Sequence, residues 1–487
     1  MFRTTLRVLV AASAASIVSG EQVQSDVCAT ISDRVDCSSG VGNPNSDFNM
    51  TQQFCEQRGC CFDNTTDASP PCFFPVEGEE VEVVHMINSN HFDAGYADLT
   101  VNIANEYFDI YFPLAAVTGA ELLHAESSKP GAGPLKWMTF SWLVSLYFDC
   151  PIGYGLHCPN ETAKKIVADA IEAQDIVWAA FPHNAELATV DESYLKFGVE
   201  MSQSLASFFN VSAPNVVSTR DVPGMPRAAL KTLHDAGVIG LSEGMNSRIV
   251  PVNVPPAFQW RSLDSSVLMP TLWHWHGYGQ LGEPGDPIRV PGSKHALAYC
   301  WRGDNAGPPL SALEVLNNAK QLQQQFALNN SNAWIYRAGL VSATSKQSPE
   351  SATRPRSGRH MRYGEFGENV VVKSSTLAEY VATLKEEGSF DKLPVVTEDL
   401  SDTWIWGVSS DPLKTQRARS IARARRTCEL LKNIDCSASD ADYFNFSRLA
   451  IKNSEHTWGV SVSHLQDLAD KGWSNEEFHE DLVRYFR

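Results

Sequence analysis

Strand-like and helix-like stretches alternate over most of the chain after residue 80. Apolar and β-branched residues run together, as in strands buried on both faces, at 81–89, 175–181, 214–218, 238–241 and 267–276. Amphipathic helical periodicity fills the intervals at 100–123, 162–174, 191–209, 226–236 and 310–326. This alternation predicts an α/β fold built on a parallel sheet or a distorted parallel β/α barrel, with its active-site loops at the carboxyl ends of the strands.

The pattern becomes all-helical near residue 411. The predicted helices lie at 411–434, 440–455, 462–471 and 475–487. We therefore expect an α/β body over 81–410 and a helical bundle over 411–487.

The first twenty residues have the pattern of a secretory signal peptide. Arg3 and Arg7 precede an apolar run at 8–18, and small residues end the segment at Gly20. No other stretch approaches the ~20 apolar residues of a membrane-spanning helix. We expect a secreted or secretory-pathway protein, in agreement with six glycosylation sequons at Asn49, Asn64, Asn160, Asn210, Asn329 and Asn445.

Residues 26–75 contain six cysteines and few Leu, Ile or Val residues. A segment of about 50 residues with this composition cannot bury a sufficient apolar core, so disulfides must stabilise it. Six cysteines allow about fifteen pairings, and the count alone does not choose among them.

This segment strongly resembles a trefoil (P-type) domain, on Arg34, Asp36-Cys37, Gly59-Cys60-Cys61-Phe62-Asp63 and Pro71-Cys72-Phe73. The resemblance implies the pairs Cys28–Cys61, Cys37–Cys60 and Cys55–Cys72. Pro71 stands where the family usually has a Trp that lines a sugar-binding cleft. The domain is accordingly interpreted either as a glycan-binding module or as a stabilising spacer.

The five remaining cysteines suit the same oxidising compartment. Cys150 and Cys158 are eight residues apart, as are Cys428 and Cys436, which favours two local disulfides. Cys300 is then left as a buried structural thiol.

Composition and charge exclude several classes of protein. Among 487 residues, 43% are hydrophobic and 20% charged, which is typical of a globular chain and not of a disordered one. Asp and Glu exceed Lys and Arg by 57 to 39, a net charge of −18 that disfavours nucleic-acid binding. The sequence has no phosphate-binding loop, so a nucleotide enzyme is not expected.

Candidate chemistry begins directly after the first predicted strand. His91 and Asp93 project from the same side of an extended chain, and both residue types bind Zn²⁺. The alternative is a His–Asp hydrogen bond at the end of a strand.

The stretch VVHMINSNHFDAGYADLT around this pair resembles the opening strand of family-38 glycoside hydrolases, the retaining α-mannosidases. Further resemblances follow in family order at 216–244, 402–419 and 455–459. Together they imply zinc ligation by His91, Asp93 and His456, and a general acid/base role for Asp221.

The chain also departs from that family. The stretch at 178–186 lacks the Asp that serves there as nucleophile and ligand, so His183 is the candidate fourth ligand and Glu186 the candidate carboxylate. Retaining hydrolysis needs the two carboxyl groups ~5–5.5 Å apart. Thr457 replaces a family Asp, and residues 1–487 do not include the long β-rich domains that full family members carry.

Aromatic and basic positions add two weaker predictions. Four aromatic side chains are candidate sugar platforms or core residues: Trp273, Tyr278, Trp404 and Trp406. His274 and His276 alternate with Trp273 and Trp275 along one strand, either as metal ligands or as hydrogen-bonded residues. A cluster of arginines is expected to be a solvated helix face: Arg417, Arg419, Arg423, Arg425 and Arg426.

Three functions remain open at this level. The first is a secreted, zinc-dependent carbohydrate-active hydrolase that acts on carbohydrates or glycoprotein glycans. The second is a non-catalytic glycan-binding or structural protein on a decayed glycosidase scaffold. The third is a zinc hydrolase such as a deacetylase, in which metal-bound water attacks and no nucleophilic carboxylate is needed.

Overall fold

A computed structural model of the chain describes residues 27–38, 51–65, 70–96, 98–125, 131, 133–222, 224–246, 252–274, 287–302, 308–329, 370–400, 412–431, 435–457, 474, 476 and 480. The expected signal peptide, Asn49, the expected helix 462–471 and nearly all of 475–487 lie outside these residues.

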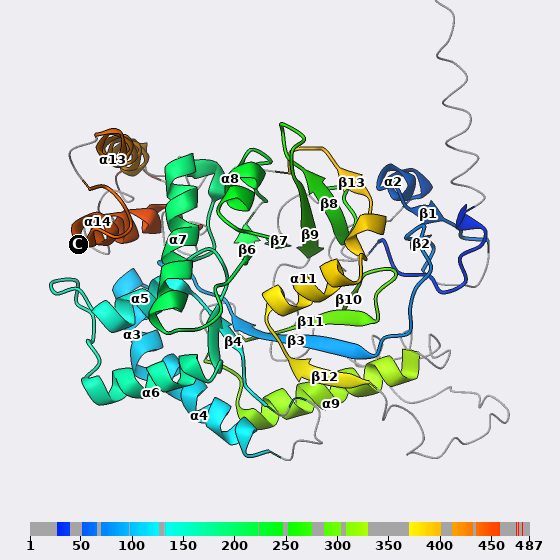
Figure 1. Ribbon diagram of the computed structural model, residues 1–487, viewed down its shortest axis with the longest axis horizontal. Helices are drawn as coiled ribbons and strands as arrows, with labels where there is room; N and C mark the ends of the chain where they lie inside the picture. The colour runs from blue at the N-terminus through cyan, green and yellow to red at the C-terminus, as the bar shows by residue number, and fades with distance from the viewer. Residues whose placement is uncertain are drawn as a thin grey trace, which may run out of the picture.

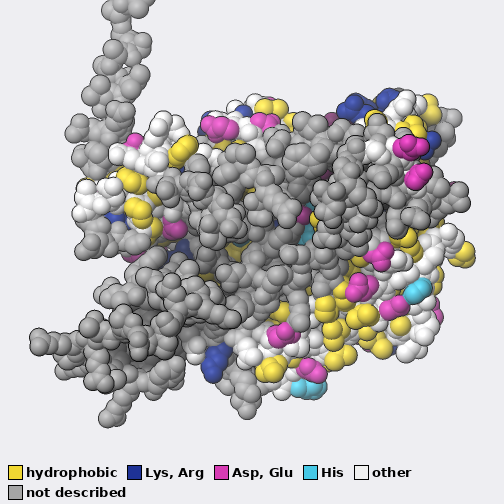
Figure 2. All heavy atoms as spheres, turned by 180° about the vertical axis from the view of Figure 1, so that it is seen from behind, with side chains coloured by type: hydrophobic (Ala, Val, Ile, Leu, Met, Phe, Trp, Pro, Cys, Tyr) yellow, Lys and Arg dark blue, Asp and Glu magenta, His cyan; other side chains and the backbone are white. Residues whose placement is uncertain are grey.

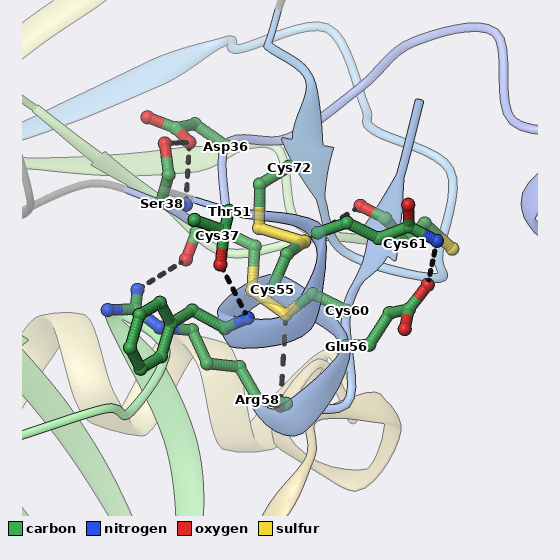
Figure 3. Close-up of a disulfide and its surroundings, with 12 residues drawn as sticks. Asp36, Cys37, Ser38, Thr51, Cys55, Glu56, Arg58, Cys60, Cys61 and Cys72 are labelled. Atoms are coloured by element: carbon green, nitrogen blue, oxygen red, sulfur yellow. Dashed lines mark hydrogen bonds between the residues drawn. A yellow bond between two sulfur atoms is a disulfide. The ribbon is translucent and has the colours of Figure 1, made fainter. Parts of the chain in front are cut away.

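The N-terminal module is small and disulfide-bonded. Helix α2 (Gln52–Gln57) packs on an antiparallel pair, β1 (Cys61–Phe62) and β2 (Cys72–Phe73). The disulfides are Cys28–Cys61, Cys37–Cys60 and Cys55–Cys72, two of which surround α2 in Figure 3. The pairing that the trefoil resemblance implies is therefore confirmed.

Two further disulfides lie in the body. They join Cys150 to Cys158 and Cys428 to Cys436, as their spacing predicted. Cys300 is buried, and burial raises the pKa of its thiol to about 12, so it is an unreactive core residue.

The first of two larger sheets is built on β3 (Val83–Asn90). Strand β11 (His295–Arg302) runs parallel to β3 along its whole length, and β10 (Ile288–Arg289) pairs antiparallel with β11. The other edge of β3 pairs first with β12 (Val371–Ser374) and then, at Ser89, with β4 (Trp137–Thr139), which continues to β5 (Ile176–Trp178). The carboxyl ends of β3, β4 and β5 therefore lie at one edge.

The second sheet has the order β13-β8-β9-β7-β6. Its strands are β6 (Val216–Val222), β7 (Gly240–Met245), β8 (Ala257–Arg261), β9 (Leu268–His274) and β13 (Val395–Val396). All its neighbours are parallel except β8 and β9. A hydrogen bond from Ala180 N to Val216 O, 2.9 Å, joins the end of β5 to the start of β6. In the described residues, the expected barrel thus takes the form of two mainly parallel sheets that are joined where β5 meets β6.

Helices cover the sheets and also lie between them (Figure 1). Helix α11 (Leu377–Glu386) contacts β11, β6 and β7, and its Tyr380, Val381 and Leu384 are fully buried. The others are α3 (Thr100–Glu106), η1 (Tyr107–Tyr111), α4 (Phe112–Leu123), α5 (Ser141–Asp149), α6 (Glu161–Glu172), η2 (Leu187–Thr189), α7 (Glu192–Phe208), α8 (Ala229–Asp235), α9 (Ala312–Asn329), η4 (Phe390–Lys392), α13 (Pro412–Leu430), α14 (Ala441–Ile451) and η5 (Lys452–Ser454).

The disulfide-bonded module and the α13–α14 pair lie at opposite ends of the molecule (Figure 1). Seen from behind, hydrophobic side chains gather low on one flank of the body (Figure 2). Among the residues of η1 and α4, Ile110, Val117 and Leu123 are about half exposed. None of the described helices is long and apolar enough to cross a membrane.

Candidate metal centre

Two histidines and two aspartates come together in the body. One ligand atom each from His91, Asp93, Asp221 and His456 lies within 4.8 Å of all the others. His456 Nε2 is 3.1 Å from Asp93 Oδ1 and 3.3 Å from Asp221 Oδ2, and His91 Nε2 is 2.6 Å from Asp93 Oδ1. Both histidines and Asp93 are buried, whereas the side chain of Asp221 is 15% exposed. This group, the metal cluster below, could bind a metal ion.

Strand ends and one late loop position these side chains. His91 and Asp93 directly follow β3, and Asp221 lies near the end of β6, so both segments reach the carboxyl edge of the sheets. Asp221 has a φ of 64° at an irregularity between Arg220 and Val222, which turns its carboxylate out of the strand alternation. His456 follows η5, more than 200 residues later.

His456 reaches the cluster because its segment pairs with the chain that follows β5. Ala185 and Glu455 form an isolated antiparallel bridge, Glu186 N donates to Ser454 O at 2.8 Å, and His456 N donates to Asn184 O at 3.0 Å.

The charges in the metal cluster stabilise one another. Burial by itself would raise the pKa of Asp93, but His91 and His456 hold that pKa below its usual range. Burial would lower the pKa of His456, but Glu455, Asp221 and Asp93 together raise it well above the usual value. The site is therefore built to keep carboxylates ionised and a positive charge among them.

Two neighbours that the sequence did not single out contact the histidines. Glu455 Oε1 is 2.8 Å from Nδ1 of His456, the carboxylate–histidine arrangement found behind many metal ligands. The Asn184 side chain lies between His91 Nδ1, at 3.2 Å, and Arg220 N, at 3.1 Å. Their only signals in the sequence were adjacency to His456 and to His183.

The two residues proposed to complete the site lie elsewhere. His183 is fully buried, and its Nε2 donates to Ile451 O at 3.2 Å. Burial also lowers its pKa to about 4. Glu186 is buried beside Ser454 and does not belong to the metal cluster. Asp221 takes the fourth place that the sequence analysis gave to His183.

The aromatic and histidine candidates around β9 do not join the metal cluster where the structure describes them. Trp273 is 3% exposed and packs against Phe258 and Trp260, so it is a core residue and not a sugar platform. His274, on β9, packs edge-on against the Tyr299 ring and is not in the metal cluster. Trp275, His276, Tyr278, Trp404 and Trp406 lie outside the described residues.

A buried polar network lies beside the metal cluster. The Arg220 guanidinium lies over the Tyr299 ring at 4.4 Å and donates to Ser242 Oγ at 2.7 Å. Thr219 Oγ1 donates to Glu243. Burial raises the pKa of Glu243 to about 7 despite the lowering effects of Thr219 and Arg220. Arg220 thus connects this network, through its backbone N–H, to Asn184.

Comparison with known proteins assigns the N-terminal module. Residues 28–75 match the trefoil (P-type) domain family. This segment is a trefoil domain. Together with the five disulfides, it suggests an extracellular or secretory protein. No match to the chain was found among curated proteins.

The body resembles glycosidase structures at low identity. An α-mannosidase from Enterococcus faecalis V583 has a TM-score of 0.48 and 11% identity, over 77% of this chain and 38% of that one. For a protein in glycosyl hydrolase family 38 from Enterococcus faecalis the values are 0.42 and 9%, over 78% and 36%. For the 4-α-glucanotransferase from Thermococcus litoralis they are 0.37 and 12%, over 76% and 55%. The chain thus spans between about a third and just over half of these proteins.

Proposed function

We propose that this protein is a zinc-dependent carbohydrate-active hydrolase of the secretory pathway or the extracellular space. The observation that carries the proposal is the buried His91/Asp93/Asp221/His456 cluster at the carboxyl edge of parallel strands. Histidine and carboxylate donors suit Zn²⁺, and Glu455 supplies the acceptor that orients a histidine ligand. The sequence resemblance to family-38 glycosidases supports a sugar substrate.

The residues of the cluster have distinct parts in this proposal. A bound zinc ion would polarise a sugar hydroxyl or a water molecule. Asp93 contributes a buried, ionised carboxylate, and Glu455 orients His456. Asp221 is the most exposed of the four, with 15% of its side chain accessible. Its Oδ2 contacts His456 and its Oδ1 accepts from Asn246, contacts that favour an ionised carboxylate. We therefore assign Asp221 to metal binding and not to the general acid role implied by the resemblance.

A zinc-dependent sugar deacetylase is the second candidate, and Asn184 favours it. A retaining glycosidase needs a nucleophilic carboxylate, yet the segment after β5 brings an amide to the metal cluster, through the contact of Asn184 with His91. Attack by metal-bound water needs no such carboxylate.

Metal analysis followed by substrate profiling tests the proposal. The secreted, glycosylated protein should contain about one zinc per chain by elemental analysis, and Asp93→Asn should lose it. Asp235→Asn, which alters an exposed Asp paired with Lys231 on α8, should keep it. Turnover of aryl α-mannosides and other aryl glycosides supports the first candidate, and release of acetate from acetylated sugars supports the second. Wild-type protein without stoichiometric zinc contradicts both. Zinc-loaded protein that turns over neither substrate class contradicts both candidate activities.

A further inference from the structure

The two histidines of the metal cluster differ in whether the ring nitrogen Nδ1 accepts or donates a hydrogen bond. The side chain of Asn184 decides this for His91. A backbone N–H can only donate, so the Asn184 side-chain atom facing Arg220 N is the carbonyl oxygen Oδ1. The amide nitrogen Nδ2 consequently faces His91 Nδ1 at 3.2 Å, and Nδ1 must accept this hydrogen bond. The proton of His91 is then on Nε2, which donates to Asp93 Oδ1 at 2.6 Å. A nitrogen that carries a proton has no lone pair for a metal ion.

His456 has the opposite arrangement. Its Nδ1 lies 2.8 Å from Glu455 Oε1 and 3.3 Å from Asn184 O, and both of these atoms only accept. Nδ1 therefore carries a proton, and Nε2, which faces the carboxylates of Asp93 and Asp221, carries a second one in the metal-free protein. A cation that displaces this second proton leaves His456 neutral with a lone pair on Nε2, whereas His91, whose Nδ1 accepts from Asn184, has no second proton to keep. Nε2 of His456 and the two carboxylates would then be the donors to the cation.

We infer that the cation is held by three protein ligands, His456, Asp93 and Asp221, while His91 binds no metal and instead orients Asp93 by donating from Nε2. This inference rests on the proposed metal function and departs from the ligand set that the resemblance implies, which includes His91. Three protein ligands leave positions open for water and a substrate oxygen, as in catalytic zinc sites, whereas structural zinc sites use four.

The decisive measurement counts imidazole ligands on the bound ion. X-ray absorption spectroscopy of the zinc-loaded, full-length protein should show scattering from one imidazole. Two imidazoles overturn the assignment. This experiment uses the wild-type protein, so it does not depend on whether a variant folds.

Zinc affinities of matched variants provide a second test, by competition with a chromophoric chelator. His91→Gln should weaken zinc binding by no more than about tenfold, the lower end of the effect of an outer hydrogen-bond partner. His456→Gln should weaken it by more than about 100-fold. His157→Gln, which alters an exposed histidine 2.7 Å from Asp109, is the control and should bind zinc as the wild type does. Equal losses in folded His91→Gln and His456→Gln, judged by circular dichroism, contradict the assignment. Wild-type protein that binds no zinc instead contradicts the proposed function itself, and the assignment with it.

Discussion

Asp221 shows how a single backbone conformation can build a site. Its φ of 64° lies in the left-handed region, which few residues other than Gly, Asn and Asp adopt. The irregularity after Arg220 breaks strict strand alternation and directs the carboxylate toward His456. No feature of hydrophobic patterning reveals such a bulge. The sequence therefore pointed to Asp221 through the family resemblance alone, and with a different role.

Asp221→Asn separates the charge of this residue from its backbone. Asn tolerates the left-handed region as well as Asp does, so the fold should be kept and the melting temperature of the metal-free protein should change little. Zinc affinity should fall by about 100-fold or more, because a ligand is lost and not merely an outer partner. Chelator competition and differential scanning fluorimetry measure the two effects. Asp235→Asn is the control, and wild-type affinity in Asp221→Asn would remove Asp221 from the ligand set.

Glu243 makes stability depend on pH. Its pKa is raised by burial to about 7, so the folded state holds this proton more tightly than the unfolded chain, where the pKa is near 4.5. Its contribution to stability is therefore most favourable below about pH 4.5 and is lost as pH rises to about 7. Glu243→Gln abolishes this loss.

The free energy of unfolding of Glu243→Gln, relative to wild type, should accordingly increase by roughly 2–3 kcal/mol between pH 5 and pH 8. Urea denaturation at the two pH values measures the difference. Glu192→Gln, which alters an exposed Glu paired with Lys196 on α7, should show no comparable change. A pH-independent difference for Glu243→Gln would mean that this carboxyl titrates normally.

At the scale of elements, the arginine cluster of α13 contains one buried residue among exposed ones. Four of its arginines are exposed, as expected of a solvated face, namely Arg417, Arg419, Arg423 and Arg426. Arg425 is buried, with its guanidinium 4.6 Å from the Tyr194 ring and 5.0 Å from the Tyr443 ring. Arg425 thus joins α13 to α7 and α14. Composition cannot distinguish this arginine from its neighbours, because only packing decides which one faces the aromatic rings.

Replacing adjacent arginines on α13 tests this difference. Arg425→Ala should destabilise the protein by roughly 2–4 kcal/mol, since it leaves Glu429, 3.2 Å away, without this partner and opens a gap among aromatic rings. Arg426→Ala should cost less than about 0.5 kcal/mol. Thermal and urea unfolding measure both changes. Equal effects would show that the packing of α13 on α7 and α14 does not depend on the buried cation.

Amphipathic helices were the elements most accurately predicted from the sequence. The helix expected at 162–174 is found at Glu161–Glu172, and the one expected at 191–209 is found at Glu192–Phe208. Strong periodicity and capping by Asn160 and Asp191 explain this agreement. The strand expected at 175–181 is found as the three-residue β5, whereas β4, also of three residues, has no pattern that predicts it.

At the scale of the molecule, the chain topology brings together site residues that no local sequence pattern relates to one another. Parallel strands place the residues after β3, β5 and β6 at one edge, which the strand–helix alternation predicted in outline. His456 joins them only because 184–186 and 454–456 pair across more than 260 residues. Residue types and spacing alone could not identify this pairing, and family resemblance was the only sequence evidence for His456.

The trefoil domain is docked on the body by polar and apolar contacts. Arg58 donates from Nε to Asn253 Oδ1 at 2.7 Å and from Nη1 to Cys37 O at 2.9 Å, and Asn253 Nδ2 donates to Phe54 O at 3.3 Å. Arg289 adds an ion pair with Asp33 at 3.2 Å. Four buried trefoil cysteines belong to the same apolar cluster as Leu393 and the residues of α11, namely Cys37, Cys55, Cys60 and Cys72. A groove of about 430 Å³ runs along this junction.

Asn253→Ala should loosen this docking while leaving both parts folded. The substitution removes the acceptor of a buried arginine, whose pKa burial already lowers to about 10, and should cost roughly 1–3 kcal/mol. Proteolysis between residues 75 and 82 should accelerate, and calorimetry should show a separate trefoil transition that the wild type lacks. Asn102→Ala, which alters an exposed Asn hydrogen-bonded to Asp98, is the matched control and should change neither. Because the trefoil core is continuous with that of the body, its detachment should also lower the melting temperature of the body. An unchanged melting temperature alongside faster cleavage would show that the trefoil domain is held to the body without stabilising it.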